Sequence, residues 1–314
     1  MIIRDVDFDR WCDDLAANEA QIVNTPMHWQ EKLRARAEKG DQVYGDTTPW
    51  AKLNDRFRFR PGEISVIAGY SGHMKSFITT YYASHLVLNL KKRVAFASLE
   101  LHPEETLYRM ACHVAACPPS PDFCDRLLEA TDDLMAIYDQ VDTVEASRIY
   151  GFVRFVSHYL QCDHIIIDSL TKLGIKKSDT DMEKQVVDRL QKLTKASGKH
   201  IHLVAHMRKP DGQQGEMKMP TKLDVGGASE ITSLVDNVIV VWTDPKKKQI
   251  KDKLERVGET MLADTEKEYL ERPDTIIGVD KQRHCKWEGK LGLWFKRNQF
   301  ITSANLGPTQ FGDL

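Results

Sequence analysis

The sequence lacks the features that mark membrane-spanning, exported or disordered chains. None of its apolar runs approaches the ~20 residues that a membrane-spanning helix requires. The first residues are rich in aspartate, whereas a signal peptide needs an apolar core there. The 314 residues are 41% hydrophobic and 29% charged, which is typical of a globular protein. These absences exclude a membrane protein and predict a cytoplasmic location.

Cysteine pairs with metal-binding spacing are also missing. Six cysteines are scattered along the chain and none forms a C-x-x-C pair, so we expect reduced thiols and no zinc site. Lysine and arginine (44) nearly balance aspartate and glutamate (46), which gives a formal net charge of -2. This balance leaves nucleic-acid binding open, because such binding depends on a local basic surface.

The chain divides by composition into three segments. Residues 1–45 are polar with apolar residues at helical spacing, and they predict short helices ending near Gly40. This segment is too small to bury a core alone, so we expect it to be a linker that packs on its own domain or on a neighbouring subunit. Residues 46–303 form the main domain, and residues 304–314 are expected to be a flexible tail.

Short apolar runs alternate with amphipathic stretches in the main domain, which is typical of buried parallel strands joined by crossover helices. These runs are residues 64–69, 94–99, 164–170, 202–207 and 237–242. Residues 274–301 predict two or three further strands, which we expect to be antiparallel, with turns near residues 287–289 and 297–298. Residues 246–273 are a charged amphipathic insert, either a solvated helix or a docking arm. The sequence therefore predicts an α/β fold with a twisted, mainly parallel sheet.

The first apolar run leads into a phosphate-binding loop. The segment Gly69-Tyr70-Ser71-Gly72-His73-Met74-Lys75-Ser76 lies between a predicted strand and helix, and it matches G-x-x-x-x-G-K-[ST] except at Met74. In this motif backbone N–H groups surround an anion, the lysine reaches the outer phosphates and the serine hydroxyl coordinates Mg²⁺. We expect Met74 to keep a negative φ, as in the first turn of a helix. The candidates for nucleotide binding are Gly69, Ser71, Gly72, His73, Met74, Lys75 and Ser76, with Lys75 also catalytic.

Polar residues stand at or directly after the ends of three further predicted strands. They should face the same crevice, because ligands bind beyond the carboxyl ends of parallel strands. Glu100 follows the second run and could deprotonate the water that attacks a γ-phosphate. Asp168 ends the third run and is a candidate to hold Mg²⁺ together with Ser76. His206 ends the fourth run and could contact the γ-phosphate. Helix entry and helix capping are the structural alternatives for the two carboxylates.

These residues in this order resemble the RecA-like core of the DnaB-type replicative helicases, especially the phage helicase-primase and mitochondrial Twinkle branch. The resembling segments lie within residues 46–301: RPGEISVIAG, GYSGHMKS, FASLE, HIIIDSL, VAHMRKP, LDVGGASEITSLVDNVIVV and VDKQRHCKWEGKLGLWF. The resemblance implies a RecA-like P-loop NTPase and a ring hexamer that moves along single-stranded DNA, with nucleotide bound between subunits. It also implies that Glu100 is the general base, Asp168 the Walker B acid and His206 the γ-phosphate sensor.

The resemblance assigns residues beyond the strand ends as well. Arg283 corresponds to a catalytic arginine finger that reaches into the neighbouring subunit's site, with Lys281 beside it near the nucleotide. Such a finger accelerates well-studied NTPases by ~10³–10⁵. The loop after His206 corresponds to the loop that grips DNA, and its candidates are Arg208, Lys209, Gly212, Gln213 and Gln214. A second basic set is Lys172, Lys176 and Lys177. DNA binding through these loops should weaken as salt rises and should show little base specificity.

The sequence therefore predicts a phage-encoded replicative helicase that hydrolyses ATP or another NTP with Mg²⁺, moves five-prime to three-prime and unwinds duplex DNA in the host cytoplasm. Its expected partners are single-stranded DNA, further copies of itself, and a primase, polymerase or single-strand-binding protein. No segment resembles a primase domain. Two alternatives stay open: a RecA-like DNA-dependent ATPase without unwinding activity, and a nucleotide-assembled DNA-binding ring with weak hydrolysis.

Overall fold

The computed structural model describes residues 23–38, 44–175, 179–207, 218–225, 228–303 and 306–312. The chain divides into two compact units, residues 1–42 and 43–314. In the first unit a 3-10 turn at Pro26–Trp29 leads into helix α2 (Gln30–Glu38), and neither element has a buried residue. The predicted end of this helical segment near Gly40 lies outside the described residues.

A nine-stranded sheet runs through the described part of the second unit, in the order β3-β2-β4-β5-β1-β6-β7-β8-β9. The parallel strands are β1 (Ile64–Gly69), β2 (Val94–Ser98), β3 (Met135–Ile137), β4 (His164–Asp168), β5 (His200–His206) and β6 (Asn237–Thr243). The antiparallel strands are β7 (Thr275–Gln282), β8 (Gly289–Lys296) and β9 (Gln299–Ile301). This arrangement confirms the predicted mainly parallel sheet with antiparallel strands at its C-terminal side.

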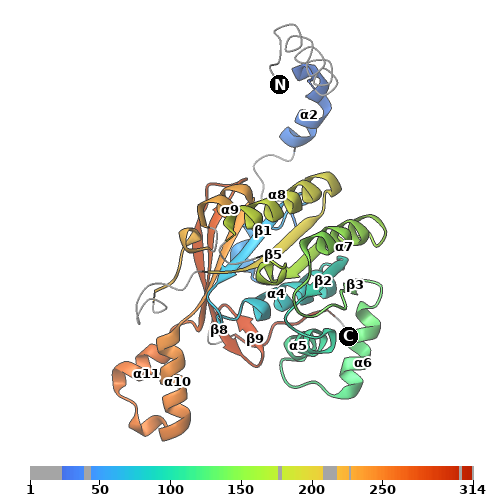
Figure 1. Cartoon of the computed structure of the whole chain (residues 1–314). Helices are drawn as coiled ribbons and strands as arrows, with labels where there is room; N and C mark the ends of the chain where they lie inside the picture. Colours follow the sequence, from blue (N-terminus) through green and yellow to red (C-terminus); the bar gives the residue numbers. More distant parts are fainter. Residues whose placement is uncertain are drawn as a thin grey trace. The chain divides into compact units, whose positions relative to one another are not determined.

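Helices cover both faces of the sheet, which explains why the parallel strands are nearly all apolar (Figure 1). Ile165 and Ile167 point into one core and Ile166 into the other, as the two-residue period of a strand requires. The first core is covered by α7 (Ala146–His158), α8 (Thr180–Ser197) and α9 (Ala228–Leu234). The second is covered by α4 (Lys75–Ser84), its π-helical extension (His85–Asn89), α5 (Pro103–Ala115) and α6 (Pro121–Thr131).

The charged insert forms two helices, α10 (Pro245–Val257) and α11 (Asp264–Leu270), which extend away from the sheet between β6 and β7 (Figure 1). The Asp244 carboxylate caps the first turn of α10, and the ammonium of Lys247 lies 3.1 Å from the Asp274 carboxylate at the base of the insert. Short turns complete the unit: α3 (Ala51–Asn54) and 3-10 turns at Leu170–Lys172, Lys222–Asp224 and Glu259–Met261. Within the described ranges, no helix has the length and apolar character needed to cross a membrane.

Residues 306–312 return to the core, although the sequence predicts a flexible tail there. Phe311 is only 3% exposed, and its ring centroid lies 5.1 Å from that of Tyr81. The side-chain amide of Gln299 donates to the Thr309 carbonyl (3.0 Å) and accepts from the Thr309 N–H (2.6 Å). One buried aromatic ring is enough to fix this segment, and a single ring leaves no periodic pattern by which the sequence could reveal it.

Candidate active site

The register of the parallel strands brings the predicted catalytic side chains together at the carboxyl ends of these strands, which form the carboxyl edge of the sheet. Gly69 at the end of β1 pairs with His206 at the end of β5, and Ser98 of β2 pairs with Asp168 of β4. The Leu99 N–H donates to the Asp168 carbonyl at 2.7 Å, so the chain enters Glu100 at this edge. The phosphate-binding loop, Glu100, Asp168 and His206 line a single cavity of about 290 Å³.

Close packing against β6 fixes the start of the phosphate-binding loop. A Cβ atom on Gly69 would lie 2.3 Å from the Val241 carbonyl oxygen, so only glycine fits at this position. The His73 imidazole is buried and accepts a hydrogen bond from the Thr243 N–H at 3.1 Å. The side chain of His73 therefore holds the loop against β6. The loop leads directly into α4, whose N-terminus can bind an anion through its N–H groups.

Met74 departs from the sequence prediction. Its φ is +60° and its ψ is +20°, which is the left-handed conformation, whereas the sequence predicts a negative φ. A non-glycine residue in this conformation costs about 1 kcal/mol or more. The side chain of Met74 is half-buried against the core beside α4, and this apolar contact offsets part of the cost. The loop thus keeps the backbone turn that glycine would supply, without a glycine.

The Lys75 ammonium is buried among the groups that a phosphate would meet. It donates to the Tyr70 carbonyl at 2.8 Å and lies 3.4 Å from Nδ1 of His206. Burial lowers the pKa of Lys75 to about 8, although the charges of Asp168 and Glu100 oppose this shift. An anion entering the cavity would stabilise the protonated ammonium.

Glu100 is held by two hydrogen-bonding neighbours. Its Oε1 accepts from Ser169 Oγ at 2.7 Å and lies 3.5 Å from His206 Nε2. The hydrogen bond with His206, together with Ser169 and the charge of Lys75, outweighs burial and lowers the pKa of Glu100 to about 2. The carboxylate is therefore ionised at neutral pH. The imidazole of His206 lies between Lys75 and Glu100.

Asp168 and Ser76 offer oxygen atoms suited to Mg²⁺. The carboxylate of Asp168 is almost fully buried and forms a hydrogen bond with the Ser76 side chain. Burial raises the pKa of Asp168, and the nearby charge of Glu100 adds to this shift. A divalent cation would relieve both effects. Mg²⁺ is commonly held by one or two protein oxygens together with substrate phosphates and water. The described residues contain no group of three His, Cys, Asp or Glu side chains that could hold a metal.

Two polar residues that contribute to this site were not predicted from the sequence. Ser169 is buried and donates the hydrogen bond to Glu100 described above, and Arg109 of α5 lines the cavity with its guanidinium 4.0 Å from the centroid of the Phe77 ring. Burial lowers the pKa of Arg109, and the charge of Asp168 opposes that shift. The only sequence signal was that Arg109 is the sole lysine or arginine between Glu100 and Arg126.

Lys281 and Arg283 lie at the opposite end of the parallel strands from the cavity, where these strands begin. Gln282 of β7 pairs with Asn237 at the first residue of β6, whereas Thr243 at the last residue of β6 contacts the phosphate-binding loop. Six residues of strand separate these points by about 20 Å. The two side chains bind the end of α9. The Lys281 ammonium donates to the carbonyls of Thr232, Ser233 and Val235, and Arg283 Nη2 donates to those of Ser233 and Leu234.

The predicted DNA-binding residues Arg208, Lys209, Gly212, Gln213 and Gln214 lie outside the described residues, as do Lys176 and Lys177. Met207, which directly precedes residues 208–217, is described. The Met207 N–H donates to the Gly69 carbonyl at 3.1 Å, and Met207 forms an antiparallel bridge with Val225. Lys172 pairs with Asp142 at 3.1 Å. The residue that follows His206 is thus held next to the start of the phosphate-binding loop.

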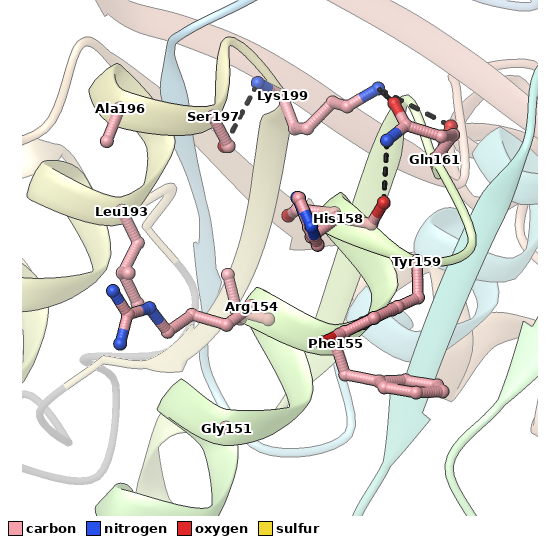
Figure 2. A pocket seen from close by; sticks show the side chains of 12 residues that line it. Gly151, Arg154, Phe155, His158, Tyr159, Gln161, Leu193, Ala196, Ser197 and Lys199 are labelled. Carbon is pink, nitrogen blue, oxygen red and sulfur yellow. Dashed lines mark hydrogen bonds between the residues drawn. The ribbon is translucent and has the colours of Figure 1, made fainter.

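A larger hollow of about 700 Å³ lies between α7 and α8 (Figure 2). Its lining includes Arg154, Phe155, Tyr159 and Lys199. Lys199 directly precedes β5, so this groove lies at the amino edge of the parallel strands and contains none of the predicted catalytic residues. The smaller cavity at the carboxyl edge is therefore the candidate active site.

Comparison with known proteins shows which family the chain belongs to. A family model described as an AAA domain matches residues 30–212, more than half of the chain. The chain belongs to this AAA domain family. Among its relatives, the DNA helicase/primase of Enterobacteria phage T3 is 24% identical over 211 residues, which cover 60% of this chain and 37% of that protein. The match therefore spans well under half of the relative's length.

Solved structures resemble this AAA domain protein over most of its length. The ATPase domain of G40P superposes with a TM-score of 0.67 at 13% identity, covering 89% of this chain and 99% of that domain. A DnaB-like replicative helicase, studied with its primase interactions, gives a TM-score of 0.65 at 14% identity and covers 89% and 67%. These likenesses establish the fold, and with the phage relative they confirm the predicted resemblance to the DnaB-type family.

The left-handed conformation of Met74 predicts how substitutions there behave. Met74→Gly should be more stable than Met74→Val by at least about 1 kcal/mol, because glycine adopts this conformation without strain and a β-branched residue does not. The strain is present before nucleotide binds, so it lowers the free energy of unfolding. Urea denaturation of both variants measures the difference. Equal free energies of unfolding for the valine and glycine variants would contradict the left-handed loop.

The lowered pKa of Lys75 predicts that nucleotide binding weakens in alkali. The neutral amine dominates above about pH 8 in the free protein, so the dissociation constant for ATP should rise about tenfold between pH 7 and pH 9. The Lys75→Arg variant is the control, because its guanidinium keeps its charge over this range. A dissociation constant for the unaltered protein that stays constant up to pH 9 would rule out the buried, easily deprotonated ammonium.

Proposed function

We propose that this chain is the motor of a ring-forming replicative DNA helicase, which couples Mg²⁺-dependent NTP hydrolysis to five-prime-to-three-prime movement on single-stranded DNA and to duplex unwinding. The observation that carries the proposal is the convergence of Lys75, Glu100, Asp168 and His206 on one cavity at the carboxyl edge of the sheet. The phage helicase/primase relative supports DNA as the track and a phage as the source.

The cavity suits a triphosphate that enters at the N-terminus of α4. Lys75 would leave the Tyr70 carbonyl to meet the outer phosphates, and Arg109 adds a second cation to the cavity wall. The Ser76 hydroxyl and the Asp168 carboxylate would hold Mg²⁺. When bound, Mg²⁺ supplies positive charge against the negative charge that develops on the transferred phosphoryl group.

Glu100 is the proposed general base, and substrate binding would activate it. In the nucleotide-free state its pKa of about 2 makes it a weak proton acceptor, because His206 and Ser169 stabilise its charge. A γ-phosphate would attract Lys75 and the imidazole of His206. Losing the hydrogen bond with His206 would raise the pKa of Glu100 toward that of an ordinary carboxyl group. The carboxylate would then accept a proton from the attacking water more readily.

Arg283 is proposed to act on the nucleotide of a neighbouring subunit. About 20 Å of strand separates it from its own phosphate-binding loop, so it cannot serve its own site. An oligomer is therefore part of the proposal, and the resemblance to DnaB-type helicases indicates a hexamer. The exposed apolar side chains of Met27, Trp29 and Leu33 in the first unit support a role for residues 1–45 in packing on a neighbouring subunit.

Contact with DNA is proposed for the segment that begins after His206, through Arg208, Lys209, Gly212, Gln213 and Gln214. The support is its attachment: the segment's base is bound to Gly69 through Met207, and His206 lies beside Glu100. A change of nucleotide in the cavity therefore acts directly on the base of this segment. A primase, polymerase or single-strand-binding protein would be a further partner.

Strand displacement tests the proposed function. The protein should hydrolyse ATP faster with single-stranded DNA and should unwind a forked duplex. Glu100→Gln should abolish both activities, with a loss of about 10²–10⁴ in kcat, while ATP binding is retained. ATPase activity and fork unwinding are measured in parallel on both proteins. Stimulated hydrolysis without unwinding would indicate a RecA-like ATPase, DNA binding with negligible turnover would indicate an assembly ring, and full hydrolysis by Glu100→Gln would remove Glu100 from this role.

Removal of the Arg283 guanidinium should lower kcat more than it weakens ATP binding. Arg283→Ala should reduce kcat by about 10³ or more, because the guanidinium stabilises charge that develops in the transition state. Lys290→Ala, which removes an exposed charge from β8, is the control and should hydrolyse ATP normally. Steady-state ATPase assays with single-stranded DNA measure both variants. Unchanged hydrolysis by Arg283→Ala would end the finger hypothesis.

A further inference from the structure

A buried carboxylate lies at the amino edge of the sheet, where the mechanism above uses only Arg283. Asp236 stands between α9 and β6, and its side chain is 2% exposed. Its Oδ2 accepts the Ile64 N–H at 3.0 Å, which ties the carboxylate to the start of β1. A charge buried this deeply is stable only if cations or hydrogen-bond donors compensate it.

The cations that the structure places at Asp236 come from two separate elements. Its Oδ1 lies 3.3 Å from the Lys195 ammonium of α8 and 3.5 Å from Nε of Arg283. The main chains are joined as well, because the Arg283 N–H donates to the Asp236 carbonyl at 3.1 Å. Arg283 is thus bound to Asp236 at both its backbone and its side chain.

The remaining contacts of Arg283 explain what this attachment does. Nη2 donates to the carbonyls of Ser233 and Leu234, at the C-terminal end of α9, where the helix dipole favours a cation. Asp236 and α9 therefore contact two nitrogens of the planar guanidinium, Nε and Nη2, and these contacts restrict its rotation. The side chain is nevertheless 46% exposed, so its position is fixed while it remains accessible.

We propose that Asp236 is a positioning residue for Arg283: the buried carboxylate, together with the last carbonyls of α9, aims the guanidinium at the nucleotide of the neighbouring subunit. This inference rests on the proposed action of Arg283 in a neighbour's site. Catalytic groups need a fixed geometry, since a displacement of about 1 Å can cost about 10²-fold in rate. Lys281 adds to the same arrangement, because its ammonium binds the carbonyls of Thr232, Ser233 and Val235 at and just beyond the end of α9.

Mixed oligomers separate positioning of the finger from damage to the protein's own site. The acceptor subunit carries Arg283→Ala, so it has an intact cavity and no finger. The donor carries Lys75→Ala, so it has no active cavity and an intact finger. Mixing the two should restore ATP hydrolysis at sites shared by an acceptor and a donor. Because the donor's own cavity is already inactive, a second substitution in the donor reports only on what it supplies to its neighbour.

The test compares two donors that differ in which aspartate is changed. Adding Asp236→Asn to the donor should lower the restored kcat about 10- to 100-fold and leave the KM for ATP unchanged, because the acceptor's own loop binds the nucleotide. Adding Asp188→Asn is the matched control, since Asp188 pairs with Lys192 on the exposed side of α8. This control should restore hydrolysis as well as the simple donor does.

The outcomes distinguish the inference from the function on which it rests. Equal restoration by the Asp236→Asn and Asp188→Asn donors would overturn the positioning role of Asp236 and leave the finger intact. A simple Lys75→Ala donor that restores nothing would overturn the finger in the neighbour's site, and the inference with it. Mass photometry on each mixture shows whether donors enter the oligomer. If the Asp236→Asn donor does not enter the oligomer, an Asp236→Glu donor is used in its place. This substitution keeps the carboxylate but displaces it, so full restoration of hydrolysis by this donor would contradict the inference.

Discussion

The main-chain hydrogen bonds between the parallel strands determine where every candidate catalytic group lies. They pair Gly69 with His206 and Ser98 with Asp168, so four strand ends stop at one level. A slip of one residue would move a strand by about 3.3 Å and turn each of its side chains to the other face. In β4 the polar residues at both ends of the isoleucine run oppose such a slip, because His164 is hydrogen-bonded to His202 and Asp46, and Asp168 to Ser76. The geometry of the active site is therefore a consequence of the contacts that fix the register of each strand.

The strand ends and their chemistry could be predicted from the sequence because the rule behind them is simple. A buried parallel strand is an apolar run, and a polar residue that ends it faces the edge where ligands bind. Strand β3 was missed although it lies in a short apolar run, residues 134–138, because its three residues are only half-buried and Leu, Met and Ala favour helices. Arg109 was missed because it belongs to the interior of a helix, where no strand end marks a side chain as facing a ligand.

The backbone of Met74 illustrates a different limit. The spacing of the loop residues correctly marked the position where glycine is expected, but the inference that methionine must avoid a positive φ was wrong. Local sterics predict the cheaper conformation, whereas the surrounding structure imposes the turn and offsets its cost through packing of the thioether side chain. The contacts of Lys281, Arg283 and Asp236 near the start of β6 could not be predicted from the sequence either, because they join residues more than 40 positions apart.

Few residues separate the groups at the two ends of the parallel strands. His206 touches Lys75 and Glu100, and the next residue, Met207, binds both Gly69 and Val225. Helix α9 begins three residues after Val225, and its seven residues span about 10 Å. Its last carbonyls hold Arg283. The residue next to a subunit's own phosphate-binding loop and the group proposed to act on its neighbour's nucleotide are therefore attached close in sequence to the two ends of one short helix.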